Sequence, residues 1–119
     1  MKLINNFMCG VQAASLAEAE YMIGAGGLDL AKALPILTHG APGSGLVQRA
    51  AARAFANDFT PNFPLHLMAK DLGYAIAEAS HLGHNLQTAS SALTIFKEAI
   101  AKGYGDQDFS AVIKAQQRG

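Results

Sequence analysis

The sequence predicts an all-α single domain of five to six helices, the first of them unusually long. Apolar residues recur at intervals of three and four along most of the chain, and no segment alternates with the two-residue period of a strand. Glycine and proline stand mostly at the ends of these helical patterns. The 119 residues are enough for one domain with a substantial core and too few for two domains of ordinary size.

The N-terminal third of the chain predicts two helices. The first runs from Leu3 to about Ala25 without a proline and ends at the Gly26-Gly27 pair, which favours a left-handed stop. Asp29 then suits the cap of a second helix over residues 30–39. Pro35 removes a hydrogen bond inside that helix, so we expect either a kink or a late start there.

The rest of the chain predicts three further helices and a short last one. A turn at residues 41–45 leads into a helix that Ser44 caps and that ends near residue 57, with Arg49 and Arg53 on one face. Pro64 fits the first turn of a fourth helix, which lasts until residue 83. A fifth helix spans about residues 88–102, and the last follows Asp108.

Composition excludes several classes of function. Half of the residues are apolar, 15% are charged and the formal net charge is zero, which is typical of a compact folded protein. Nine basic residues balance nine acidic ones without a dense basic stretch, so we expect neither nucleic acid nor an acidic membrane as a partner. The single cysteine, Cys9, suits a small core residue, and the lack of a signal peptide or membrane-length apolar run predicts a cytoplasmic protein.

The opening run of the chain carries the most informative polar residues. Lys2 and Asn6 are four residues apart, so an amine and an amide share one face of an apolar helix. Such a pair can hold an oxygen-bearing substrate and exchange a proton with it. The alternatives are a frayed, solvated lysine and structural hydrogen bonds from Asn5 and Asn6.

Four blocks of sequence resemble the C-terminal domain of the β-hydroxyacid dehydrogenases, the family that includes 3-hydroxyisobutyrate dehydrogenase and tartronate semialdehyde reductase. The blocks are Lys2 to Asn6, residues 27–29, Phe63 with residues 67–72, and residues 103–110, in the family's order and at plausible spacings across essentially the whole chain. The resemblance implies a helical fold like that of the 6-phosphogluconate dehydrogenase C-terminal domain. It also implies a substrate-binding and dimerisation domain spanning residues 1–119.

The same resemblance implies roles for individual residues. Lys2 would be the catalytic proton donor and acceptor, and Asn6 would bind the substrate. Lys70 would contact the cofactor, NAD or NADP, while Asn5 and Asp71 would give structural support. The implied reaction is the reversible oxidation of a small 3-hydroxy acid, similar to 3-hydroxyisobutyrate, to its semialdehyde, in a homodimer or higher homo-oligomer.

Other features of the sequence limit what this resemblance implies. No Gly-x-Gly-x-x-Gly turn follows a predicted strand, so we expect the N-terminal Rossmann domain of the family to be absent from this chain and the chain alone to be inactive. The alternative is a non-catalytic helical interaction module that dimerises through the long first helix. Relatives that reduce imines resemble the chain less, because they typically replace the lysine. His81 and His84 have a possible metal spacing, but Gly83 is expected to break their helix, and no metal site is predicted.

Overall fold

A computed structural model describes residues 1–116 and confirms the all-helical fold. The elements are α1 (Lys2–Ala25), α2 (Leu30–Thr38), α3 (Gly45–Phe55), α4 (Leu65–His81), α5 (Gln87–Ala101) and a final 3-10 helix, η1 (Phe109–Ala115). Within these residues the nearest approach to a sheet is a single isolated bridge between Pro64 and Asp108. None of the described helices is both long and apolar enough to cross a membrane.

Most predicted helix ends are confirmed to within two residues. Gly27 ends the first helical segment with a φ of 74°, and the Asp29 side chain accepts a hydrogen bond from the Ala31 amide at 2.9 Å. That cap starts α2 at Leu30 and Pro35 lies inside the helix, so the late start, one of the two alternatives expected at Pro35, is wrong. Ser44 caps α3 by accepting from the Val47 amide at 3.2 Å.

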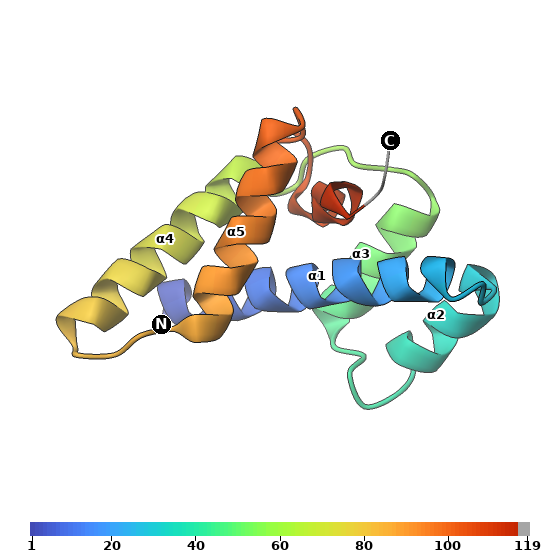
Figure 1. Ribbon diagram of the computed structural model, residues 1–119, viewed down its shortest axis with the longest axis horizontal. Coiled ribbons are helices and arrows are strands. Elements are labelled where there is room, and N and C mark those ends of the chain that lie inside the picture. Colours follow the sequence, from blue (N-terminus) through green and yellow to red (C-terminus); the bar gives the residue numbers. More distant parts are fainter. Residues whose placement is uncertain (117–119) are drawn as a thin grey trace.

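Helix α1 runs through the middle of the molecule, and each of the other described helices packs against it (Figure 1). One core cluster joins α1 to α4, α5 and η1, and Leu65, Leu72, Phe96 and Val112 are its largest fully buried apolar side chains. A smaller cluster joins α1 to α2 and α3 through Leu16, Leu34, Val47, Ala50 and Ala51. Both clusters therefore depend on α1, which explains why it is long and apolar on more than one side.

Gly10 sets the distance between α1 and α4. A Cβ atom at this position would lie 3.1 Å from Leu72 Cδ2, closer than almost all real contacts of this kind. Leu72 is fully buried and cannot move aside without disturbing the first core cluster. The glycine thus allows a close approach that brings the residues one turn earlier on α1 against Asp71 on α4.

One buried carboxyl group has no partner in this core. Glu20 on α1 is 6% exposed, and neither carboxyl oxygen has a hydrogen-bond partner in the described part of the chain. Glu20 lies about one helical turn after Leu16, which belongs to the second cluster, and after Ala17, which belongs to the first. Burial raises the pKa of Glu20 from 4.5 to about 7, since the ionised form is poorly solvated there.

Replacing Glu20 with leucine is expected to stabilise the fold in a pH-dependent way. Because the folded pKa is raised, the pH-dependent cost of the carboxyl group is absent below pH 4.5, grows up to about pH 7 and is constant above it. This pH-dependent cost lowers the free energy of unfolding by about 3 kcal/mol at pH values above the folded pKa. Urea unfolding of Glu20→Leu at pH 8 and pH 4.5 measures it, and the exposed Glu18→Leu is the matched control on the same helix. Equal effects of the two variants at pH 8 would contradict the burial argument.

Candidate functional site

Helices α1 and α4 bring the predicted polar residues together at the start of α1. Lys2, Asn6 and Asp71 line one cavity of about 360 Å³, whose apolar walls are Leu3, Phe63 and Leu67. Lys2 is exposed to solvent, whereas Asn6 and Asp71 are half-buried. An amine, an amide and a carboxylate therefore face one small space open to solvent.

A hydrogen bond fixes the amide of Asn6. Its Nδ2 donates to Asp71 Oδ2 at 2.8 Å, across 65 residues of sequence. Because an ionised carboxylate only accepts hydrogen bonds, the amide nitrogen must point to Asp71, and the carbonyl oxygen must point away from it. Asp71 thus orients Asn6. The second N–H hydrogen of the amide and one lone pair of its oxygen, which also accepts a hydrogen bond from Asn5, can then bind a ligand.

The structure does not bring Lys70 or Asn5 into this group. Lys70 is exposed on α4, and its Nζ lies 6.0 Å from the centre of the Tyr74 ring, outside the residues that line the cavity. Asn5 is exposed and does not line the cavity, but its Nδ2 donates to Asn6 Oδ1 at 3.4 Å and to Cys9 Sγ at 4.0 Å. Lys70 and Asp71 are adjacent on α4 and therefore point in different directions, which separates Lys70 from the cavity.

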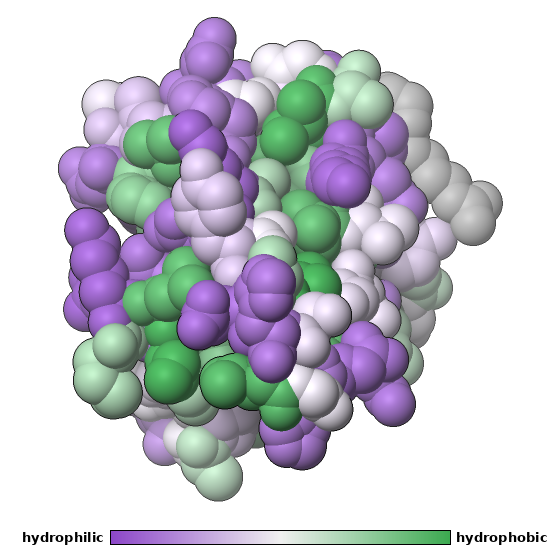
Figure 2. Space-filling model, turned by 90° about the vertical axis from the view of Figure 1, so that its left-hand side faces the viewer, coloured by the Kyte–Doolittle hydropathy of each residue, from purple (hydrophilic) through white to green (hydrophobic). Residues whose placement is uncertain are grey.

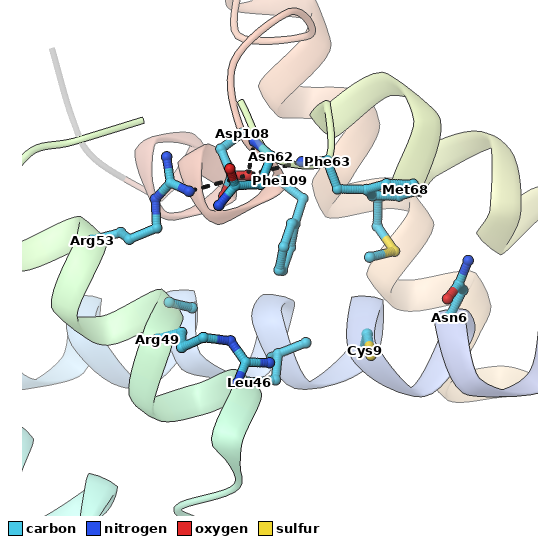
Figure 3. A pocket seen from close by; sticks show the side chains of 11 residues that line it. Asn6, Cys9, Leu46, Arg49, Arg53, Asn62, Phe63, Met68, Asp108 and Phe109 are labelled. Atoms are coloured by element: carbon cyan, nitrogen blue, oxygen red, sulfur yellow. Dashed lines mark hydrogen bonds and ion pairs between the residues drawn. The ribbon is translucent and has the colours of Figure 1, made fainter. Parts of the chain in front are cut away.

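A second cavity of about 250 Å³ adjoins the first and shares Asn6 and Phe63 with it (Figure 3). It lies between α1, α3 and η1. The remaining side chains that line it are Cys9, Leu46, Arg49, Ala50, Arg53, Asn62, Met68, Asp108 and Phe109. The predicted packing of Cys9 against the core is confirmed. Asn6 and Phe63 thus separate a cavity lined by Lys2 from a cavity lined by two arginines of α3.

Asp108 organises the wall of the second cavity. It is 1% exposed, and its Oδ1 accepts from the backbone amides of Asn62 at 3.0 Å and Phe63 at 3.2 Å. Its Oδ2 accepts from the amide of Ser110 at 3.1 Å and from the hydroxyl at 2.5 Å. Burial raises the pKa of Asp108, but these hydrogen bonds outweigh it and the net shift is downward, so the group is held ionised.

Sequence patterns did not single out Arg49 or Asp108 as site residues. The only signal for Arg49 was its place four residues before Arg53 on one helix face. Asp108 was expected only to precede the last helix, which it does cap. The histidines remain apart from the site, since His81 ends α4 and Gly83, with a φ of 80°, separates it from His84. Residues 1–116 contain no group of three or more potential metal ligands.

The chain is similar to known dehydrogenases and reductases. The family described as NAD-binding of NADP-dependent 3-hydroxyisobutyrate dehydrogenase matches residues 1–116. L-threonate dehydrogenase of Escherichia coli K12 is 33% identical over 114 residues, which are 96% of this chain and 38% of that protein. Glyoxylate/succinic semialdehyde reductase 1 of Arabidopsis thaliana is 32% identical over 97% of this chain and 40% of its own length.

A solved structure has the same fold. The crystal structure of 3-hydroxyisobutyrate dehydrogenase from Salmonella typhimurium aligns with a TM-score of 0.90 and 34% identity, over 95% of this chain and 40% of that one. The chain thus spans about two fifths of the length of the relatives it matches.

Proposed function

The chain belongs to the family of NADP-dependent 3-hydroxyisobutyrate dehydrogenases, and on that premise we propose that it is the substrate-binding and dimerisation domain of such an enzyme. The reaction we propose is the reversible, NAD(P)-dependent oxidation of a small 3-hydroxy acid to its semialdehyde. A Rossmann domain outside this chain would complete the active site. The observation that supports the proposal is the convergence of Lys2, Asn6 and Asp71 on one cavity.

Lys2 is the proton donor and acceptor in this mechanism. During oxidation its side-chain nitrogen accepts the proton of the substrate hydroxyl group, while the carbon atom that bears this hydroxyl group loses its hydrogen as hydride. During reduction its ammonium group returns a proton to the carbonyl oxygen. NAD(P), when bound, supplies the hydride acceptor or donor.

Asn6 holds the substrate beside Lys2. The bond to Asp71 directs the Asn6 carbonyl oxygen away from α4, where it can accept a hydrogen bond from the substrate hydroxyl group. The second N–H hydrogen of the amide can donate to a substrate oxygen. Asp71 therefore acts as a positioning residue, and its effect on the substrate passes through Asn6.

Lys70 is the residue of this chain that we propose for the cofactor side. Its ammonium group is exposed, and residues 1–116 provide no carboxylate within ion-pair distance of it. A free cation on the α4 surface fits a contact with the nicotinamide end of the cofactor. The described helices offer no Gly-rich turn after a strand, so the main cofactor contacts belong to the Rossmann domain.

A chimeric enzyme tests the function. Residues 1–116 of this chain would replace the matching 114 residues of Escherichia coli L-threonate dehydrogenase. We expect formation of NAD(P)H from at least one small hydroxy acid by the chimera and none by the 119-residue chain alone. A chimera that folds, as judged by circular dichroism, and oxidises no hydroxy acid would contradict the function. Turnover by the chain alone would contradict its dependence on a Rossmann domain.

An exposed apolar face supports the proposed homodimer. A groove of about 290 Å³ at the start of α1 is lined mainly by apolar side chains, among them Leu3, Phe7, Leu82, Leu86 and the half-exposed Ile4. Figure 2 shows apolar side chains between polar ones on this end of the molecule. The same face would serve the alternative function, a non-catalytic interaction module.

Sedimentation equilibrium of the purified chain is expected to show a dimer, and the Ile4→Lys variant is expected to shift it toward monomer. The introduced charge would have to be buried in an apolar contact, which is costly. Glu98→Lys, on the exposed side of α5 and outside the groove, is the matched control. A monomer at every concentration reached would contradict the dimer.

A further inference from the structure

Arg53 is fully occupied by structural contacts, although it lines the second cavity. Its Nε donates to the backbone oxygen of Asp58 at 3.1 Å, and its Nη2 donates to that of Thr60. Its Nη1 lies 3.7 Å from Asp108 Oδ1. These contacts tie α3 to the loop before α4, so the charge of Arg53 is already balanced by Asp108.

Arg49, one turn earlier on α3, is not occupied in this way. Within residues 1–116 its guanidinium group makes no hydrogen bond or ion pair. Its side chain folds back along α3, and Nη1 lies 3.2 Å from the point where a Cβ of Gly45 would stand. The glycine leaves room for this position. Arg49 is exposed to solvent, and Figure 3 shows its guanidinium group beside Leu46, whereas Arg53 extends toward Asp108.

Of the two arginines that line the cavity, Arg49 therefore has no carboxylate among residues 1–116 to balance its charge. Asp108, the acidic residue that lines it, already accepts four hydrogen bonds and lies beside Arg53. A guanidinium group stays charged at every physiological pH and presents paired donors that match the two oxygens of a carboxylate. An anionic group is the ligand that best fits this position.

The position of Arg49 relative to Lys2 defines the shape of that ligand. Arg49 lines the second cavity together with Cys9, which is seven residues beyond Lys2 on α1. Asn6 lies between them and lines both cavities. A substrate that places its reacting carbon beside Lys2 and extends past Asn6 would therefore direct its far end toward the cavity that Arg49 lines.

We propose that Arg49 is a specificity-determining residue that binds a second anionic group, at the end of the substrate remote from the reacting carbon. The site would then take dianionic hydroxy acids of four or more carbon atoms in preference to acids with a single charge. This inference rests on the proposed function for the identity of the reaction. The binding of the second charge is a property of the described residues and needs no turnover.

Two unreactive acids of equal length test the proposal on the 119-residue chain. Succinate carries a carboxylate at both ends and butyrate at one, and their binding is followed through the arginine Nε–H signals in nitrogen-15 NMR spectra. We expect succinate to bind about 10-fold more tightly than butyrate, as a charge-assisted hydrogen bond would give, and to shift the Arg49 signal. Because neither acid is oxidised and no dinucleotide is present, the result is independent of the chimera assay.

Two variants separate a specific site from a general charge effect. Arg49→Gln is expected to remove the preference for succinate, whereas Lys97→Gln, which loses the same charge on the exposed side of α5, is expected to retain it. The helical circular dichroism of both variants should match that of the parent chain. Equal binding of the two acids, no binding of succinate, or an unchanged preference in Arg49→Gln would each overturn the proposal.

Discussion

Replacing Asp108 with alanine is expected to lower the free energy of unfolding by about 3–5 kcal/mol, the cost of breaking a buried and hydrogen-bonded charge pair. The substitution leaves the amides of Asn62, Phe63 and Ser110 without their acceptor and Arg53 without its carboxylate. Each of these groups would have to bind water or remain unsatisfied. Urea unfolding followed by circular dichroism measures the loss.

Asp106→Ala is the matched control for this prediction. Asp106 is fully exposed two residues away, and its carboxylate lies 3.7 Å from His66 Nδ1. An exposed pair of this kind contributes little, so the control should change stability by less than about 0.5 kcal/mol. Similar losses in the two variants would contradict the role that we assign to Asp108.

The pH dependence of stability gives a second readout of the same carboxylate. Hydrogen bonds lower the pKa of Asp108 below 3.8 in the folded protein, in spite of burial. Its contribution is therefore fully present above the unfolded pKa and is lost as the pH falls through the folded pKa. Between pH 5 and pH 2 we expect the parent chain to lose more stability than Asp108→Asn, which has no charge to neutralise at this position.

Replacing Lys2 with methionine is expected to lower kcat of the chimera by about 100- to 10,000-fold, the usual range for removal of a general acid or base. Methionine keeps much of the side-chain length but cannot carry a proton. The KM should change much less, because Asn6 and Asp71 remain in place to bind the substrate. Initial rates of NAD(P)H formation over a range of substrate concentrations separate the two effects.

Two further variants sharpen the assignment of Lys2. Lys2→Arg keeps the positive charge, but its guanidinium group does not give up a proton at working pH, so we expect the same loss of kcat. Lys32→Met, on the exposed surface of α2, should retain the parent activity. A Lys2→Arg enzyme with unchanged kcat would show that Lys2 supplies only charge.

The helical framework could be predicted from the sequence because its signals are local. The period of the apolar residues, Asp29 and Ser44 as caps, and Gly27 as a left-handed stop each act within a few residues of the chain. The sequence alone leaves two alternatives at Pro35, a kink or a late start of the helix. A strong cap at Asp29 determines where α2 begins, and the helix accommodates the lost hydrogen bond.

The site could be predicted only in part, because its contacts join distant parts of the chain. Lys2 and Asn6 share a helix face, and their proximity followed from spacing alone. The bond from Asn6 to Asp71 and the ring of donors around Asp108 depend on how α1, α4 and η1 pack. Likewise, spacing placed Arg49 beside Arg53 but could not show that only one of them lacks a partner among the described residues.

Rescue of a Lys2→Ala chimera by added methylamine tests the central claim most directly, because it asks whether an amine at this position transfers the proton. Alanine leaves space beside Asn6 in the cavity for a small amine. We predict that the slow rate of NAD(P)H formation rises with methylamine concentration, while the parent chimera is unaffected by the same additions. A Lys2→Ala chimera that binds its substrate and stays equally slow at every amine concentration would contradict the role of Lys2.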